Sequence, residues 1–253
     1  MNSQSENNDL IVGRNAIMEA LRAGRDLDTL YVARGERTGS IGKIIAQCRD
    51  AGISIKDVDS RKLDFMCGGE NHQGVAATVA AHSYASVDDI FEVADSRGEK
   101  PFIIICDEIE DPHNLGAIIR TAECAGAHGI IIPKRRCATL SYAVSKTSAG
   151  AIEYMPVARV SNLSSTIDEL KKRGVWIYGA DMIGNDWCQT DFRDAMALVI
   201  GSEGNGLGRL IREKCDFTIS LPMMGQINSL NASVAAGIMM YEVTRQREGL
   251  KSV

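Results

Sequence analysis

Hydrophobic residues recur in the second half of the chain as short continuous runs. The runs are FIIIC (102–106), GIIIP (129–133), VWIYGA (175–180) and ALVIG (197–201). Strands buried on both faces of a parallel sheet have this pattern, whereas half-exposed strands alternate. Segments with helical spacing follow the runs, at 115–125, 142–149, 163–173 and 229–246. The pattern predicts a doubly wound α/β domain, in which ligands bind beyond the carboxyl ends of the strands.

The first 83 residues predict a smaller α/β layer structure. Helical spacing at 13–21, 41–51 and 62–66 alternates with strand patterns at 29–33, 53–58 and 75–81. The segment 84–99 carries five acids and one arginine and reads as a short helical connector. We therefore expect a small domain at 9–83, a linker at 84–99 and a larger domain at 100–253.

Composition adds little beyond the class of an ordinary globular protein. Of 253 residues, 45% are hydrophobic and 24% are charged, and 28 basic against 33 acidic residues give a net charge of −5. Any nucleic-acid contact must therefore come from local basic clusters. The apolar run at 102–106 is far shorter than the roughly 20 residues of a membrane helix, and the start, MNSQSENNDL, has no secretory pattern. We expect a cytoplasmic protein.

Cysteine and histidine spacing excludes several kinds of chemistry. The seven cysteines lie at least 13 positions apart, so CxxC pairs are absent and reduced thiols are expected. The four histidines have no metal-ligand spacing, and neither HExxH nor GxSxG occurs. We expect no metal site and no serine hydrolase.

A polar segment follows the predicted strand FIIIC. Residues 107–111 hold four acids in five positions, and the helix that follows carries Asn114 near its start and Arg120 about two turns later. An ordinary capped helix with an exposed arginine explains this segment equally well.

A glycine-rich loop, GSEGNGLG (201–208), follows the strand ALVI. Four glycines in eight positions let the backbone turn tightly and approach a ligand closely. The loop is neither a P-loop nor a GxGxxG motif. Glu203 is the loop's sole ionisable residue, and its alternative role is an acid near a helix start.

The third polar segment is SLPMMGQINSLNASVAAGIMMYEV (220–243), in which 221–223 end a strand and Asn228 or Ser229 is expected to cap a helix. Small residues in that helix indicate close packing. Packing does not explain Asn228, Ser229 and Asn231. A basic cluster, Lys134, Arg135 and Arg136, follows the strand at 129–133, where it could contact phosphates.

The segments EDPHNLGAIIRTA, LVIGSEGNGLGRL and ISLPMMGQINSLNASVAAG resemble the three motifs of the SpoU/TrmH-type ribose 2′-O-methyltransferases of the SPOUT superfamily. They occur in the family's order over about 130 residues. GRNAIMEAL and HQGVAA (72–77) also resemble the substrate-binding domain of the RlmB-like 23S rRNA guanosine methyltransferases. The resemblance extends over nearly the whole chain.

The resemblance implies a deep trefoil knot in the C-terminal domain, S-adenosylmethionine as cofactor and a homodimer with the active site near the partner chain. It also implies a ribosomal-protein-like RNA-binding domain at the N-terminus. By motif match, the expected cofactor residues are Gly201, Leu221 and Leu230, with neighbours Ala180, Ile200, Met223 and Ser229.

The resemblance also implies roles in catalysis and RNA binding. Arg120 is expected to orient the ribose-phosphate, while Asn114, Glu203 and Asn231 hold the 2′-hydroxyl. A guanidinium with a pKa above about 12 is a poor base. RNA contacts are expected from Arg14, Asn15, His72 and Gln73 in the small domain and from Lys134, Arg135 and Arg136 in the large one. Each residue of the small-domain set could equally cap or turn its own element.

Other functions stay open at this stage. The same chemistry could act on a tRNA or another rRNA ribose. A non-catalytic RNA-binding ribosome-assembly factor could keep the fold, although it would have no reason to retain Asn114, Arg120, Glu203 and Asn231 together. A nicotinamide dehydrogenase is disfavoured, because this sequence lacks the glycine motif that such enzymes carry after the first strand of the sheet.

Overall fold

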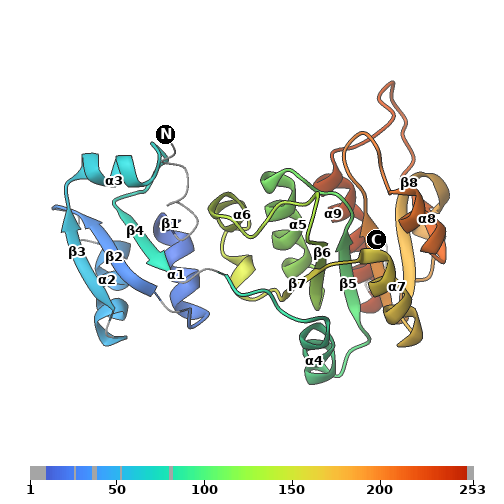
Figure 1. The fold of residues 1–253 in the computed structure, drawn as a ribbon, viewed down its shortest axis with the longest axis horizontal. Helices are drawn as coiled ribbons and strands as arrows, with labels where there is room; N and C mark the ends of the chain where they lie inside the picture. Colours follow the sequence, from blue (N-terminus) through green and yellow to red (C-terminus); the bar gives the residue numbers. More distant parts are fainter. Residues whose placement is uncertain (1–9, 26, 36–38, 52, 80–81, 250–253) are drawn as a thin grey trace. The chain divides into compact units, whose positions relative to one another are not determined.

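The computed structural model describes residues 10–25, 27–35, 39–51, 53–79 and 82–249. The chain groups into two compact units, one of Met1–Ser83 with Leu140–Tyr154 and one of Tyr84–Thr139 with Met155–Val253 (Figure 1). The units differ from the expected domains in two places. The expected linker 84–99 belongs to the second unit, and 140–154 group with the first.

The first unit is a four-stranded sheet with helices on both faces. Its strand order is β1-β4-β2-β3, in which β2 and β3 are parallel and the other pairs antiparallel. Its elements are β1 (Leu10–Val12), α1 (Arg14–Arg22), β2 (Leu27–Ala33), α2 (Ser40–Asp50), β3 (Ser54–Val58), α3 (Ser60–Met66), β4 (Val75–Val79), α6 (Tyr142–Thr147) and the 3₁₀ turn η1 (Ala151–Glu153). Residues 80–81 of the expected last strand lie outside the described residues.

Hydrophobic side chains of this unit form a layer on each face of the sheet. Ile17 of α1 and Ile44 of α2 pack with Leu30 of β2 on one face. Leu63 of α3 packs with Leu10 and Val58 on the other. The sheet thereby holds α1 and α3 on opposite sides.

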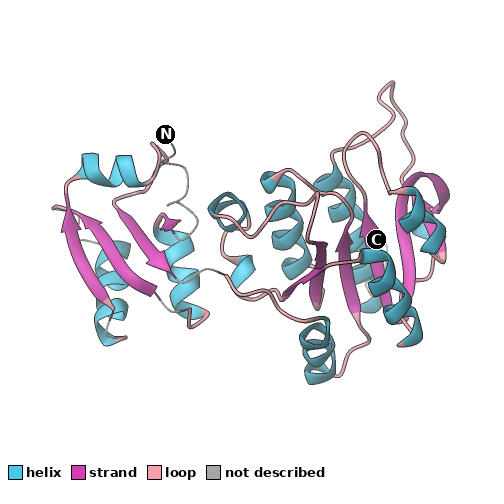
Figure 2. Ribbon diagram, viewed as in Figure 1, coloured by secondary structure: helices cyan, strands magenta, loops and turns pink. Residues whose placement is uncertain are grey.

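The second unit is a six-stranded, wholly parallel sheet in the order β10-β8-β9-β5-β6-β7 (Figure 2). Its strands are β5 (Phe102–Cys106), β6 (Gly129–Pro133), β7 (Val157–Val160), β8 (Trp176–Asp186), β9 (Met196–Ile200) and β10 (Phe217–Ser220). Its helices are α4 (Val87–Arg97), α5 (Pro112–Cys124), α7 (Leu163–Lys172), η2 (Trp187–Gln189), α8 (Arg209–Lys214) and α9 (Ala232–Arg247). The continuous apolar runs therefore predicted the sheet type correctly.

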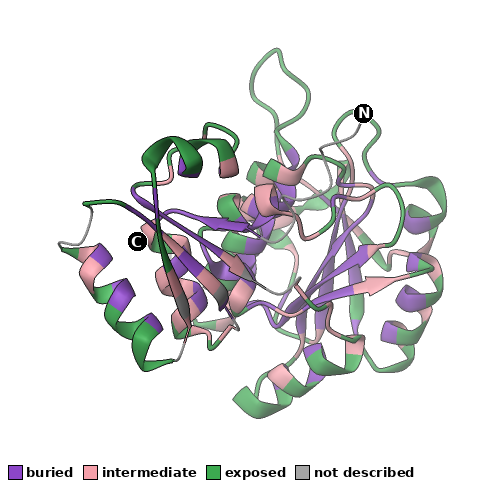
Figure 3. Cartoon of the chain, turned by 60° about the vertical axis from the view of Figure 1, so that its left-hand side comes forward, coloured by how far each residue is buried: buried purple, intermediate pink, exposed green. Residues whose placement is uncertain are grey.

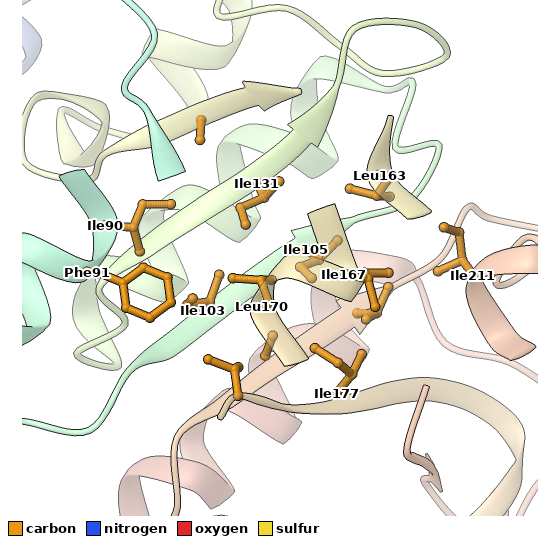
Figure 4. Close-up of a cluster of buried hydrophobic side chains, with 14 of the residues drawn as sticks. Ile90, Phe91, Ile103, Ile105, Ile131, Leu163, Ile167, Leu170, Ile177 and Ile211 are labelled. Atoms are coloured by element: carbon orange, nitrogen blue, oxygen red, sulfur yellow. The ribbon is translucent and has the colours of Figure 1, made fainter. Parts of the chain in front are cut away.

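Helices cover both faces of this sheet. On one face, Ile90 of α4, Ile167 of α7 and Ile211 of α8 pack with alternate residues of the strands, such as Ile103 and Ile105 (Figure 4). Helices α5 and α9 pack against the sheet at β6 and β9. All five residues of β5 are buried, and the strands of the large sheet are coloured mostly as buried in Figure 3. Helix α4 is thus part of the large unit's core rather than a free connector.

The strand order places a reversal point at the centre of the sheet. From β5 the chain proceeds through β6 to β7 on one side, whereas β9 lies on the other side of β5 and is followed by β10 beyond β8. Parallel sheets of this kind bind ligands at the carboxyl ends of the strands that flank such a point. A late strand, β9, also lies between the earlier strands β5 and β8, an order consistent with the expected knot.

Several short elements were not predicted. The strands β1 and β7 have three and four residues, and helix α8 has six. The expectation for the last helix needs two corrections, because β10 ends at Ser220 and the cap is Asn231 rather than Asn228 or Ser229. Among the described residues, no helix is long and apolar enough to cross a membrane.

Candidate active site

A cavity of about 700 Å³ lies in the second unit where β9 and β10 end, beside the middle of β8. Its lining includes all seven residues expected to hold the cofactor: Ala180, Ile200, Gly201, Leu221, Met223, Ser229 and Leu230. Glu203 and Asn231 also line it. The volume lies within the range of about 300 to 1,000 Å³ usual for small-ligand pockets. The cavity therefore has room for a cofactor such as S-adenosylmethionine.

The glycine-rich loop forms one wall of this cavity as a tight turn. Ser202 and Gly206 exchange two backbone hydrogen bonds of 3.0 Å each. A Cβ at Gly201 would lie 2.2 Å from the carbonyl carbon of Gly206, and Gly206 itself has a φ of +65°. A side chain at 201 would collide with backbone, so glycine is required there for steric reasons.

Asp107, the residue after β5, connects the first polar segment to this loop. Its carboxylate accepts a 2.7 Å hydrogen bond from Gly208 N–H, and its own N–H donates to the Ile200 carbonyl at 2.8 Å. Burial raises the pKa of the Asp107 carboxyl, and the hydrogen bond from Gly208 opposes the shift. The carboxylate fixes where the glycine loop ends and α8 begins.

Asn231, Asn114 and Glu203 meet in one hydrogen-bonded network. Asn231 caps α9, its Oδ1 accepting from Ser233 N–H at 3.0 Å and Val234 N–H at 3.2 Å. Its Nδ2 donates to Asn114 Oδ1 at 2.9 Å and to Glu203 Oε1. Three of the four residues expected in catalysis, from three distant parts of the sequence, are therefore in contact.

Arg120, the fourth expected residue, lies apart from this network. It is exposed on α5 and is absent from the lining of both cavities described here. Six residues along a helix correspond to about 600°, so Arg120 points about 120° away from Asn114 around α5. Its expected role stays a prediction.

An ion pair at the cavity wall was not predicted from the sequence. Arg212 of α8 donates from Nε to Asp181 Oδ2 at 2.6 Å, and both residues line the cavity. Asp181 lies in the middle of β8, two residues beyond the last residue of that strand that pairs with β9. The two residues are 31 positions apart in the sequence, so no helix or strand spacing could have indicated the pair.

The expected basic cluster lies on the loop after β6, outside both cavity linings. Lys134, Arg135 and Arg136 are all exposed. Arg136 donates to Glu108 Oε1 at 2.9 Å, which connects this loop to the one after β5. A phosphate contact by this cluster stays a prediction.

In the first unit, the expected RNA-contacting residues hold two segments together. Arg14 Nε donates to the Gln73 carbonyl at 2.9 Å, and Arg14 N–H donates to Gln73 Oε1 at 3.3 Å. His72 accepts from Gly74 N–H at 2.9 Å and contacts Asp64 at 3.1 Å. Asn15 is exposed on α1. These contacts give Arg14, His72 and Gln73 structural roles, while their RNA role stays a prediction.

The portions of the chain that the structure describes hold no group of three or more His, Cys, Asp or Glu side chains able to bind a metal ion.

The sequence matches two family models that together cover most of the chain. Residues 101–241 match the SpoU rRNA Methylase family, and 10–85 match the RNA 2′-O ribose methyltransferase substrate binding domain. The chain belongs to the SpoU family, whose members take the methyl group from S-adenosylmethionine.

Individual relatives match nearly the whole length of the chain. YacO of Bacillus subtilis (strain 168), whose name refers to the TrmH family of tRNA/rRNA methyltransferases, is 51% identical over 96% of this chain and 98% of its own. The corresponding Staphylococcus aureus protein (strain MSSA476) is 45% identical over 96% and 98% of the two chains.

Solved structures show the same fold. The SpoU methyltransferase AviRb of Streptomyces viridochromogenes in complex with AdoMet superposes with a TM-score of 0.82 at 26% identity, covering 99% of this chain and 96% of AviRb. An AdoMet-bound rRNA methyltransferase of Sinorhizobium meliloti gives 0.79 at 25% identity, over 96% and 88%.

Proposed function

We propose that this protein transfers the methyl group of S-adenosylmethionine to the ribose 2′-hydroxyl of a guanosine in 23S rRNA. The observation that carries the proposal is the contact of Asn114, Asn231 and Glu203 at the edge of the large cavity. A cofactor in this cavity would lie beside polar groups able to hold a hydroxyl. The enzyme is expected to act in the cytoplasm, where ribosomes assemble.

The large cavity fits the cofactor chemically as well as in size. Gly201 lets backbone groups line the wall, and Leu221 and Leu230 add apolar surface beyond β10. Bound there, S-adenosylmethionine supplies an electrophilic methyl group on a sulfonium. We assign cofactor binding to these residues together with Ala180, Ile200, Met223 and Ser229.

The protein's own contribution to the reaction is positioning. In-line displacement requires the 2′-hydroxyl to be held on the axis of the breaking bond, and such orientation supplies much of an enzyme's rate. Asn114 and Glu203 offer a donor and an acceptor for that hydroxyl, and Asn231 orients both. We assign Arg120 to the ribose-phosphate, because a planar guanidinium holds a phosphate with two parallel hydrogen bonds.

RNA selection is assigned mainly to the first unit, which matches the family's substrate-binding domain. Arg14, Asn15, His72 and Gln73 are the proposed contacts there. Lys134, Arg135 and Arg136 are proposed to contact phosphates near the site. Sequence-specific RNA binding targets unpaired nucleotides, so the target is expected in a loop.

A homodimer through the knotted domain is also proposed. Val234, Ile238 and Tyr241 are 50%, 37% and 53% exposed, and their spacing of four and three residues places them on one side of α9. Such an apolar stripe is typical of a helix that packs against a partner. A second copy of the chain is the proposed partner.

A tRNA ribose is the second candidate target, because the names of the relatives cite both tRNA and rRNA. The two targets separate when the purified protein is incubated with methyl-labelled S-adenosylmethionine and either unmodified 23S rRNA or unmodified tRNA. Label in 23S rRNA alone is expected. Label in tRNA alone would replace the proposed target with the second candidate.

A further inference from the structure

Arg159, near the carboxyl end of the edge strand β7, carries a buried donor without a partner. Among the described residues, its Nε is the one buried side-chain nitrogen or oxygen that forms no hydrogen bond. Its Nη2 donates to the Lys134 carbonyl at 3.0 Å, and the residue as a whole is partly exposed. Buried polar atoms without a partner are rare in native proteins, and a bound ion is one physical reason for them.

No negative charge compensates this guanidinium within the described part of the chain. Arg159 forms no ion pair there, and its neighbours are the ring of Tyr84, with the centroid 5.2 Å from the guanidinium carbon, and the Cys137 thiol. Burial raises the pKa of that thiol to about 12, although the charge of Arg159 acts in the opposite direction. Cys137 is therefore neutral at pH 7. A partly buried cation without a counter-charge attracts an anion strongly, because less water screens it.

Two further cations beside this guanidinium lack an acidic partner. Lys134 and Arg135 are exposed on the loop after β6, and neither forms an ion pair with a described residue. Lys134 N–H donates to the Val160 carbonyl at 2.8 Å, which fixes the loop against the end of β7. Arg136, the third cation of the loop, already donates to Glu108. The three cations without an acidic partner therefore come from the ends of two neighbouring strands.

The loop that presents Lys134 and Arg135 is held in a defined conformation. Arg136 and its partner Glu108 both have a left-handed backbone, with φ of +55° and +59°. Non-glycine residues are uncommon in this region and are found often at functional sites. Ala138 N–H also donates to the carbonyl of residue 109 at 2.8 Å. A loop ordered before the ligand arrives lowers the entropic cost of binding.

The acidic loop after β5 determines on which side an anion is favoured. Glu108, Glu110 and Asp111 line a smaller cavity of about 290 Å³ that shares part of its lining with the large one. Their charges repel phosphate, and of the three only Glu108 forms an ion pair with Arg136. Arg159 lies on β7, which β6 separates from β5. A phosphate is therefore favoured on the β7 side of the basic loop.

We propose that Arg159, Lys134 and Arg135 bind a phosphodiester group of the substrate RNA outside the nucleotide that is methylated. In the sheet, β7 lies three strands from β9, so at about 4.8 Å per strand the site is roughly 14 Å from the cofactor cavity. Both sites lie at the carboxyl ends of parallel strands, within reach of one RNA strand. The inference rests on the proposed methyl transfer to RNA and adds a residue outside the three motifs.

The test measures the affinity of the full-length protein for unmodified 23S rRNA at several salt concentrations. Each phosphate contact releases counterions, so the logarithm of the affinity falls with the logarithm of the salt concentration, with a slope proportional to the number of contacts. We expect Arg159→Gln to reduce this slope by about 0.7 to 0.9 and to weaken RNA binding about 10-fold. Arg159→Lys keeps the charge and is expected to keep the slope. The Kd of S-adenosylmethionine is expected to be unchanged in both.

Arg97→Gln is the matched control, because it removes the same charge by the same substitution at the opposite edge of the sheet. Arg97 is exposed at the end of α4, shortly before β5 begins, and the variant is expected to keep the wild-type slope. Arg135→Gln is a second test variant, whose side chain has no contact within the described chain. It is expected to lower the slope by the same amount, and it decides the question if Arg159→Gln has a reduced thermal midpoint.

The outcomes separate this inference from the proposed function. An unchanged slope in both test variants, or an equal reduction in Arg97→Gln, would overturn the phosphate contact and leave methyl transfer standing. A reduced slope in the test variants without methyl transfer to any RNA would support the contact and refute the proposed function. Calorimetry with inorganic phosphate identifies the source of the anion. Phosphate binding that is lost in Arg159→Gln, with an unchanged RNA slope, would assign the site to free phosphate instead of RNA.

Discussion

The buried carboxylate of Asp107 accepts a 2.7 Å hydrogen bond from Gly208 N–H, across 101 residues of sequence. The bond joins the end of β5 to the end of the glycine-rich loop, at the reversal point of the sheet. The loop lines the proposed cofactor cavity, so its shape depends on a residue outside that cavity's lining.

We expect Asp107→Ala to weaken cofactor binding. The change leaves Gly208 N–H unpaired at a partly buried position, at a cost of about 1 to 3 kcal/mol, which corresponds to a rise of about 5- to 150-fold in the Kd of S-adenosylmethionine by calorimetry. Asp107→Asn keeps an acceptor oxygen and is expected to stay within about threefold of the wild type. Wild-type affinity in the alanine variant would remove this role.

Asn231 combines a helix cap with the polar network, and two substitutions separate these roles. Asn231→Asp keeps the acceptor for Ser233 and Val234 N–H but loses the donor toward Asn114 and Glu203. We expect a thermal midpoint close to that of the wild type with methyl transfer reduced at least about 10-fold.

Asn231→Ala loses the cap as well, which costs about 1 kcal/mol of stability and a few degrees of thermal midpoint. If Asn231→Asp transfers methyl groups at the wild-type rate, the network contributes only to stability.

Arg120 is proposed to hold the ribose-phosphate with the two parallel donors of its guanidinium. Arg120→Lys keeps the positive charge and loses this geometry. We expect turnover of RNA to fall at least about 10-fold while the cofactor Kd is unchanged. Near-wild-type turnover in the lysine variant would show that charge alone suffices.

The exposed apolar stripe on α9, formed by Val234, Ile238 and Tyr241, predicts that the protein forms a dimer. Ile238→Glu places a charge at the centre of the stripe and is expected to give monomers in sedimentation, whereas the wild type sediments as a dimer. Leu210→Glu, at an exposed position on α8, is the matched control and stays dimeric. A monomeric wild type at micromolar concentration would contradict the dimer.

His82 predicts a pH dependence of stability. Its Nε2 lies 2.6 Å from Arg25 Nη1, and burial together with the Arg25 charge lowers the pKa of His82 to about 4. The unfolded chain binds this proton near pH 6.5, so stability declines as the pH falls from about 6.5 to about 4 and no further below. The slope from this group is at most about 1.4 kcal/mol per pH unit.

Thermal midpoints measured between pH 7 and pH 4 test this dependence. His82→Gln is expected to have a shallower slope than the wild type. Some slope remains, because burial also lowers the pKa of His128. His113→Gln, at an exposed position of α5, serves as the control. An unchanged slope in His82→Gln would contradict the assignment.

The sequence was most informative where periodicity and burial agree. The run 102–106 became a fully buried central strand, and the helix at 115–125 was found within a few residues of α5. Short strands such as 157–160 were missed because four residues carry too little periodicity. The helical connector proved to be core because its amphipathic face, with Ile90 and Phe91, needs a sheet to cover it.

Site residues that belong to a sequence motif could be predicted. Contacts between residues that only the folded chain brings together could not. The motifs indicated Asn114, Glu203 and Asn231, and these residues are in contact. The cap was placed two or three residues early, because Asn228, Ser229 and Asn231 are all good capping residues. No local pattern indicated that Asp107 would hold Gly208, since that contact depends on neighbouring β5 and β9.

The most direct test of the central claim is the chemical position of the transferred methyl group. The protein is incubated with methyl-labelled S-adenosylmethionine and unmodified 23S rRNA, the RNA is digested to nucleosides, and the labelled nucleoside is identified. We predict 2′-O-methylguanosine. Label on a base rather than a ribose, or no label in a preparation that binds the cofactor, would contradict the account.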